Sequence, residues 1–96
     1  MIKSAVISEV AKRTGISKSD VQRTIEVLIQ VIKEAIVEQR AVHFRGFGSF
    51  LTKRRARKVA RNIAQNTALI IGAHYVPIFK PSKAFVQLIK QHVQDL

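Results

Sequence analysis

The chain has 96 residues, 47% of them hydrophobic, and it contains no cysteine. This length predicts one small domain with a marginal core, and the composition excludes disulfides, thiolate metal sites and a disordered chain. The formal net charge is +11, and residues 41–81 hold eight basic residues and no acidic one. Positive charge concentrated in one segment is typical of proteins that bind a polyanion, most often nucleic acid.

The N-terminal residues 1–15 interrupt their apolar positions with Ser, Glu and Lys, so they lack the continuous apolar core of a signal peptide. No segment approaches the length of a membrane span, and the absence of cysteine fits a reducing compartment. We therefore expect a cytoplasmic protein with no membrane partner.

The first 15 residues predict a short helix. Its apolar positions recur at helical spacing; they are Val6, Val10 and Ala11, with Ile2 or Ile7 beside them. Gly15 follows these positions, and glycine is typical of the residue just past a helix end.

A second helix of about five turns is predicted next. Ser17 and Asp20 form a variant of the capping box at its start. Val27, Val31 and Val37 lie off its main apolar stripe, so more than one face of the helix is apolar. A subunit interface would cover the second face, and deeper burial inside one chain is the alternative. The main stripe consists of Val21, Ile25, Leu28, Ile29, Ile32, Ala35 and Ile36.

From Ala41 the apolar period shortens to two, which predicts strands. Phenylalanines then follow at intervals of three, which would place them on opposite faces of a flat strand; they are Phe44, Phe47 and Phe50. Gly46 and Gly48 therefore predict a tight turn or bulge. A phosphate-binding glycine loop is disfavoured because the Lys and Ser/Thr of a P-loop do not follow.

Residues 51–61 and 67–79 predict the two limbs of a long hairpin. Asn62 and Asn66 tolerate the turn conformations that its tip requires. The outgoing limb carries cations on both faces, so neither face can be buried in a core, and the limb must project into solvent or onto a partner. Its cations are Lys53, Arg54, Arg55, Arg57, Lys58 and Arg61.

Pro81 and Ser82 predict the start of a last helix. Its apolar positions form one stripe, namely Phe85, Leu88, Ile89 and Val93.

Three segments carry a family resemblance: RGFGSF at 45–50, the charged limb ending in RN at 61–62, and VPIFKPSKAF at 76–85. They resemble the HU and integration host factor family of bacterial histone-like DNA-binding proteins, and the resemblance covers the whole chain. ISK at 16–18 sits where the family joins its first two helices.

The resemblance implies an α+β fold in one histone-like domain over residues 1–96. Residues 1–40 would form a helical dimerisation part with a two-helix hairpin. Residues 41–81 would form a three-stranded antiparallel sheet with a long protruding β-ribbon arm, the arm at about 53–75, and residues 82–96 a short C-terminal helix. It also implies an intertwined homodimer, or a heterodimer with a paralogue, that bends and compacts double-stranded DNA on the nucleoid. The arms would bind the minor groove with little sequence specificity.

The expected DNA-binding residues lie mainly on the arm and the sheet. They are Lys3, Arg45, Ser49, Lys53, Arg54, Arg55, Arg57, Lys58, Arg61, Asn62, Ile63, His74, Lys80 and Lys83. The expected dimer core consists of Leu28, Ile29, Ile32, Ile36, Phe44, Phe47, Phe50 and Phe79.

The chain departs from the family pattern in three places. Ile63 stands where the family has proline at the arm tip. Isoleucine is among the wedges that minor-groove proteins insert between base steps, and packing on the hairpin tip is the alternative role. Gln65 and Asn66 replace the usual Thr and Gly, and Gln39 replaces a glycine before the first strand. The return limb keeps only His74 as a titratable cation, and its residues 69–71 either serve another interaction or stiffen the ribbon.

Catalysis finds no support in the sequence, so we expect no enzyme, cofactor, metal or small-molecule substrate. The histidines His43, His74 and His92 lack ligand spacing. The acids fall on predicted helices, where Glu34 and Glu38 favour surface pairing; they are Glu9, Asp20, Glu26, Glu34, Glu38 and Asp95.

Two alternatives to duplex DNA binding remain. An RNA-binding protein reads single strands by aromatic stacking, but the arm has no aromatic residue before Tyr75. A structural assembly protein would associate through residues 69–71.

Overall fold

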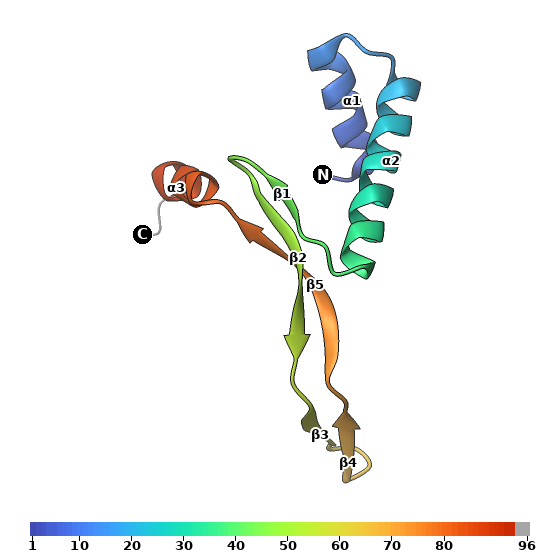
Figure 1. The fold of residues 1–96 in the computed structure, drawn as a ribbon, viewed down its shortest axis with the longest axis vertical. Helices are drawn as coiled ribbons and strands as arrows, with labels where there is room; N and C mark the ends of the chain where they lie inside the picture. Colours follow the sequence, from blue (N-terminus) through green and yellow to red (C-terminus); the bar gives the residue numbers. More distant parts are fainter. Residues whose placement is uncertain (94–96) are drawn as a thin grey trace. The chain divides into compact units, whose positions relative to one another are not determined.

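The computed structural model describes residues 1–93 (Figure 1). The chain divides into two compact units, residues 1–35 and the residues from Ile36 onward. Each unit is described by itself.

The first unit contains the helical hairpin of α1 (Lys3–Thr14) and α2 (Lys18–Val37), except for the last two residues of α2, which belong to the second unit. Gly15 ends α1 in the left-handed conformation, at φ 74°, and its N–H donates to the Ala11 carbonyl. Ser17 precedes α2 and caps its start, because its hydroxyl oxygen accepts a hydrogen bond of 3.3 Å from the Asp20 backbone N–H. Both predicted helix boundaries are therefore confirmed. Glu38 lies just past the end of α2 rather than on it, and it pairs with Arg40 at 2.7 Å.

Very little of the helical unit is buried. Ile7, Val21 and Ala35 are the buried hydrophobic residues of the part of the chain that the structure describes. The apolar face of α2 is largely open to solvent in the single chain, and its exposed members are Val27, Leu28, Ile29, Val31 and Val37. Exposed apolar surface of this kind is typical of an interface with a partner.

The second unit contains a three-stranded antiparallel sheet of β1 (Val42–Phe44), β2 (Gly48–Arg55) and β5 (His74–Pro81), in the order β1-β2-β5. A tight turn joins β1 to β2: Gly46 has φ 80°, and the Phe47 N–H donates to the Phe44 carbonyl at 3.0 Å. Gly48 is required by close approach, because a Cβ there would lie 2.5 Å from the Lys80 carbonyl oxygen. The turn that the phenylalanine spacing predicts is confirmed.

Five phenylalanines cluster on one side of this sheet and on the last helix, α3 (Lys83–His92). Neighbouring ring centroids in the cluster are 4.9 to 6.5 Å apart, and its members are Phe44, Phe47, Phe50, Phe79 and Phe85. Ser82 caps α3 by accepting a hydrogen bond from the Phe85 N–H at 3.1 Å, and its own N–H donates to the Phe47 carbonyl. The predicted helix over 82–96 thus ends at His92 with Val93 as its cap. Asp95 lies outside the described residues.

The arm continues β2 and β5 as a second ladder of β3 (Lys58–Asn62) and β4 (Thr67–Ile71). Two residues on each strand, 56–57 and 72–73, separate the two ladders. The predicted hairpin is therefore interrupted, at positions rich in Gly and Ala that offer few cross-strand side-chain contacts. Because the gap is equal on both strands, the register is the same on its two sides: Arg55 is opposite His74 before it, and Lys58 is opposite Ile71 after it.

None of the three helices in residues 1–93 is both long and apolar enough to cross a membrane.

Candidate nucleic-acid interface

The register of the sheet gives its two faces different chemistry. Phe50 lies opposite both Val42 and Phe79, so these residues share a face with the phenylalanine cluster, which we call the aromatic face. Ser49 lies opposite both His43 and Lys80, and these residues share the other face because side chains alternate along a strand. The cluster covers only the first of the two faces.

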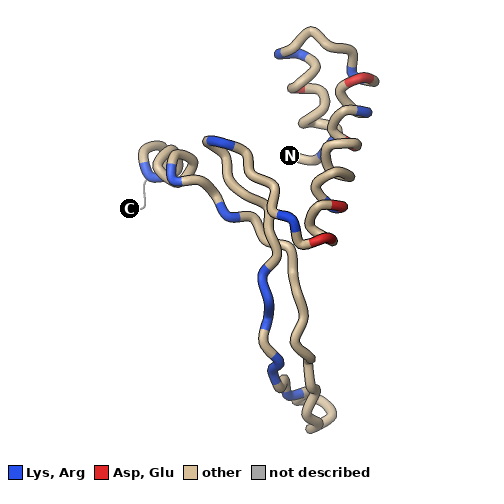
Figure 2. Tube along the Cα trace, viewed as in Figure 1, with Lys and Arg blue, Asp and Glu red and all other residues tan. Residues whose placement is uncertain are grey.

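The second face continues into the arm as a line of cations. Counting alternate residues from Ser49, and using the unchanged register across the gap, we assign eight polar residues to it and call it the basic face: His43, Ser49, Lys53, Arg55, Arg57, Arg61, His74 and Lys80. Arg54 and Lys58 alternate onto the other side of the arm. Figure 2 shows Lys and Arg along the outgoing limb and none along the return limb.

The arm cations have no acidic partner close by in the sequence, because residues 41–81 contain no acid. The ion pairs in the described part of the chain all use cations of the first 40 residues, and they are Lys3–Glu26, Arg13–Glu9 and Arg40–Glu38. The Lys and Arg residues of the arm are also exposed. Their charges therefore add to a single positive field.

Lys3 differs from the other predicted DNA-binding residues. Its ammonium group donates to Glu26 Oε1 at 3.1 Å, so its charge is balanced within the helical unit. Hydrogen bonds from the Gln22 amide and from Lys3, together with the charge of Lys3, lower the pKa of the Glu26 carboxyl. A phosphate contact by Lys3 would compete with this pair.

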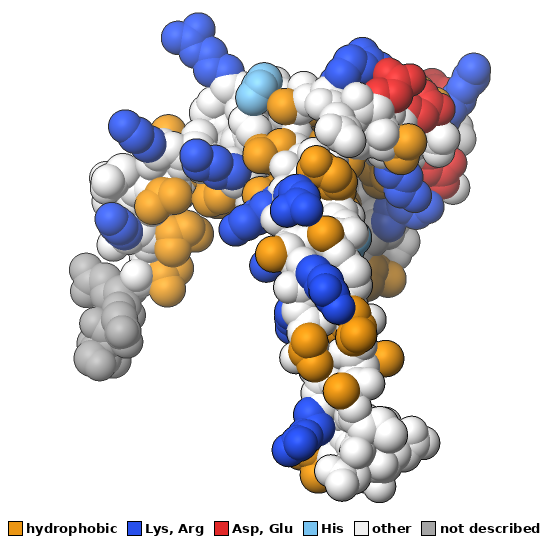
Figure 3. Space-filling view, turned by 60° about the horizontal axis from the view of Figure 1, so that its bottom comes forward, with side chains coloured by type: hydrophobic (Ala, Val, Ile, Leu, Met, Phe, Trp, Pro, Cys, Tyr) orange, Lys and Arg blue, Asp and Glu red, His pale blue; other side chains and the backbone are white. Residues whose placement is uncertain are grey.

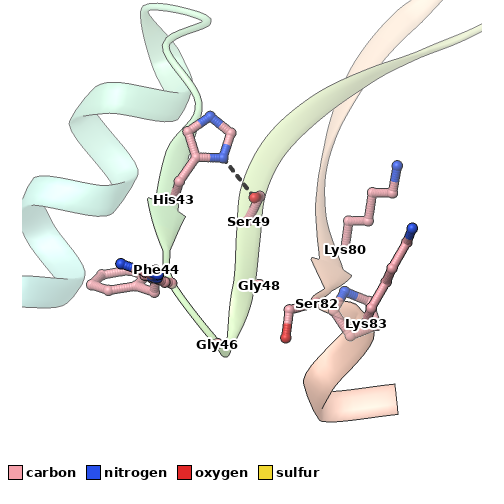
Figure 4. Close-up of a pocket in the computed structure, with 10 residues that line it drawn as sticks. His43, Phe44, Gly46, Gly48, Ser49, Lys80, Ser82 and Lys83 are labelled. Carbon is pink, nitrogen blue, oxygen red and sulfur yellow. Dashed lines mark hydrogen bonds between the residues drawn. The ribbon is translucent and has the colours of Figure 1, made fainter. Parts of the chain in front are cut away.

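Four predicted residues meet at an open hollow of about 520 Å³ at the end of the sheet (Figure 4). They are Arg45, Ser49, Lys80 and Lys83. His43 and Ser82 also line the hollow, and neither was among the predicted DNA-binding residues. His43 Nδ1 lies 2.6 Å from the Ser49 hydroxyl oxygen, and Ser82 caps α3, whose N-terminus favours negative charge. The signal that identifies the face of His43 is its position between Val42 and Phe44, two apolar residues of a strand whose side chains alternate.

The arm tip presents Ile63 to solvent with 88% of its surface exposed. Asn62 shapes the turn, because its side-chain oxygen accepts hydrogen bonds from the backbone N–H groups of Ala64 and Gln65. Asn66 closes the turn in the left-handed conformation, at φ 51°. The Ile63 side chain is therefore not packed against the tip of the hairpin.

The apolar residues 69–71, which the sequence analysis treated as one group, divide between the two faces. Ile70 lies opposite Val59 on the basic face, whereas Leu69 and Ile71 lie opposite Ala60 and Lys58 on the other side. The face of each residue can be predicted by counting residues back to Phe50 or Phe79, whichever lies on the same limb: an even count gives the face of these phenylalanines, and an odd count gives the other face.

Within residues 1–93 no cluster of three His, Asp or Glu side chains is placed to hold a metal ion.

Comparisons with known proteins agree on one family. The sequence profile described as "Bacterial DNA-binding protein" matches residues 1–90. The DNA-binding protein HU of Lactococcus lactis subsp. lactis is 35% identical over 88 residues, which cover 92% of this chain and 97% of the relative. The DNA-binding protein HU of Geobacillus stearothermophilus is 34% identical over 90 residues, which cover 94% and 100%.

Known structures show the same fold. An Anabaena HU–DNA cocrystal structure superposes with a TM-score of 0.89 at 28% identity, over 94% of this chain and 98% of that one. HU from Thermotoga maritima superposes with a TM-score of 0.66 at 29% identity, over 94% and 100%. The α+β fold implied by the sequence resemblance is therefore confirmed.

Proposed function

The chain belongs to the bacterial DNA-binding protein family, and we propose that two copies of it form an intertwined dimer that binds duplex DNA through the minor groove. In this proposal the dimer acts on the nucleoid, in the cytoplasm, and bends and compacts DNA with little sequence specificity. The family is the one that the sequence resemblance named. The matching relatives are named as DNA-binding proteins, in agreement with the prediction that the chain is not an enzyme.

The basic face carries this proposal. Its cations run from the sheet into the arm without an acid among them. A line of cations can contact several phosphates along a duplex, and neutralising phosphates releases counterions, which supplies much of the free energy of DNA binding. Tyr75 lies opposite Arg54 and thus on the other side, and no Phe, Tyr or Trp lies on the basic face. The face therefore lacks the large aromatic side chains on which single-stranded bases stack most strongly, which favours a duplex over single-stranded RNA.

Exposed apolar surface supports the dimer. The open face of α2 is one such surface, and Phe44 and Phe47 are also exposed. An apolar hollow of about 400 Å³ lies beside α3, and its lining residues are Phe79, Pro81, Phe85, Val86, Ile89 and Lys90. A second copy of the chain, or a close paralogue, would complete the core around the predicted dimer residues.

Ile63 is proposed as the wedge that bends the DNA. Its side chain projects into solvent from the turn at the arm tip, and cations precede it on β3. Minor-groove proteins insert isoleucine and similar apolar side chains between base steps, and the opened step kinks the duplex.

The test is the salt dependence of duplex binding, with Arg55→Ala compared with Arg54→Ala. The two arginines are adjacent and exposed, but only Arg55 lies on the basic face. Loss of one phosphate contact in each arm should reduce the slope of log affinity against log salt by about 1.8 for Arg55→Ala, and by less for Arg54→Ala. Duplex binding that does not weaken with salt would contradict the proposed function. Equal effects of the two substitutions would contradict the assignment of the basic face.

A further inference from the structure

On the basic face, the β3–β4 ladder of the arm has one cross-strand pair in which both residues are large and apolar. Val59 on β3 lies directly opposite Ile70 on β4, and the two side chains are 66% and 58% exposed. Arg61 lies two residues after Val59 on the same face of β3, and Arg57, in the break between the two ladders, precedes Val59 by two residues and is assigned to the same face by the unchanged register. Figure 3 shows hydrophobic side chains between the Lys and Arg side chains along the arm.

The neighbours of this pair leave it accessible. Arg61 lies opposite Ala68, and the unchanged register places Gly72 across from Arg57, so small residues face both arginines. Positions two apart on a strand are about 7 Å apart, so the arginines stand about 13 Å apart with the apolar pair midway. The surface is therefore an apolar centre between two flexible cations.

This pattern is complementary to one chemistry, namely a chain with apolar units between anions. In the DNA backbone deoxyribose rings alternate with phosphates, and the rings form the walls of the minor groove. We propose that the Val59–Ile70 pair packs against deoxyribose in the minor groove while Arg57 and Arg61 contact phosphates, and that this contact selects DNA over RNA. The proposal rests on the proposed function and assigns the return strand a role in it.

The selection follows from the ribose 2′-hydroxyl. In an RNA duplex this group lines the wide, shallow minor groove, and it is the feature by which proteins distinguish RNA from DNA. Neither Val59 nor Ile70 has a side-chain donor or acceptor, so a 2′-hydroxyl pressed against them loses its water without gaining a partner. The loss of one such hydrogen bond corresponds to about a tenfold or larger drop in affinity.

The experiment replaces both residues by threonine. Val59→Thr with Ile70→Thr keeps β-branched side chains in both strand positions but adds hydroxyls that can bond a 2′-hydroxyl. The control is Leu69→Thr with Ile71→Thr, which makes the same kind of change on the other side of the same strand, where Leu69 is 59% exposed. Neither pair changes the net charge.

The measurement is competition between duplex DNA and duplex RNA of one sequence at fixed salt. Each protein gives a DNA-to-RNA preference, and comparing the preferences of parent and variant cancels the difference between B-form and A-form shape. We expect the Val59/Ile70 variant to lose about tenfold or more of the parent's preference for DNA, and the Leu69/Ile71 control to retain it. The salt slope on DNA should stay at the parent value in both variants.

Several results would overturn the inference. One is an unchanged preference in the Val59/Ile70 variant, and another is an equal loss in the control. Light scattering that shows self-association of the free parent, abolished in the Val59/Ile70 variant, would assign the pair to a second copy of the chain instead. A parent that binds the duplexes without salt dependence would contradict the proposed function itself, whereas salt-dependent DNA binding with an unchanged preference would contradict only this inference.

Discussion

The helical hairpin and the arm both leave most of their side chains in solvent, but with opposite chemistry. The first 40 residues mix seven basic with five acidic residues and form ion pairs among themselves, and their exposed surface includes a long apolar face of α2. Residues 53–61 of the arm hold six cations and no acid. The two regions therefore lack different things: the hairpin lacks an apolar cover, and the arm lacks anions.

This difference shows how one small chain can bind two different partners through two separate surfaces. An apolar cover is supplied by association of like chains, which depends on buried area and little on salt. Anions are supplied by a polyelectrolyte, whose binding weakens steeply as salt rises. Substitutions in the hairpin should thus change stability and oligomeric state, and substitutions in the arm should change DNA binding at constant stability.

The largest expected effect is on the hairpin. Ile29 is 41% exposed in the single chain, so a second copy of the chain that covers this surface would add to the cost of Ile29→Asn. We expect a loss of about 4 kcal/mol in the free energy of unfolding of the dimer, because each of two isoleucines loses about 2 kcal/mol of burial. Chemical denaturation at several protein concentrations measures it, and the parent midpoint should rise with concentration. Lys33→Asn, at an exposed position of α2, is the control. A concentration-independent midpoint, or equal losses in the two variants, would contradict the dimer.

A smaller effect is expected at the arm tip, on bending rather than on stability. Ile63→Gly should retain most of the affinity for linear DNA, since the cations remain, and should lose the kink, whose unstacking cost is about a few kcal/mol. Energy transfer between dyes at the two duplex ends, at matched saturation, measures the bend. Unfolding should be unchanged, because Ile63 is almost fully exposed.

Ile63→Pro is the second variant for the tip. It restores the residue that the family resemblance places there and should bend DNA at least as well as the parent. Sharp bending by Ile63→Gly would show that isoleucine is not the wedge and that the bend arises from phosphate neutralisation along the basic face.

The smallest expected change is in the stability of the helical hairpin at acid pH. Hydrogen bonds from Gln22 and Lys3 lower the pKa of Glu26 below its usual value. The ionised carboxylate is therefore stabilised more in the folded state than in the unfolded state. The stabilisation is present above the unfolded pKa, about 4.3, and is lost as the pH falls through the lowered pKa. Glu26→Gln should flatten this part of the curve of melting temperature against pH. Lys3→Gln should flatten it only partly, because the Gln22 bond remains. An unchanged curve in Glu26→Gln would contradict the assignment.

Single residues of the sequence predicted most helix ends and turns of the fold correctly. Gly15 and Ser17 mark helix ends through properties that each residue has on its own, a tolerance of left-handed backbone and a side-chain acceptor. Gly46 marks the turn between strands for the same reason, and the paired asparagines mark the arm tip. The interruption of the arm at residues 56–57 and 72–73 was not predicted, because it reflects weak pairing between two strands rather than a preference of either one.

The element order, the segment that carries the charge and the family follow from the sequence alone, because spacing, composition and motif residues are all properties of a linear chain. The residues that lie across from one another on the ribbon follow only from the folded structure. Leu69 and Ile70 alternate onto opposite faces of β4 as neighbours in any strand do, but their partners across the ribbon, Ala60 and Val59, are set by the pairing of β3 with β4. The hollow that gathers Arg45, Lys80 and Lys83 likewise joins residues from distant parts of the chain. Register sets such neighbours, and it is fixed by how strands pair in space.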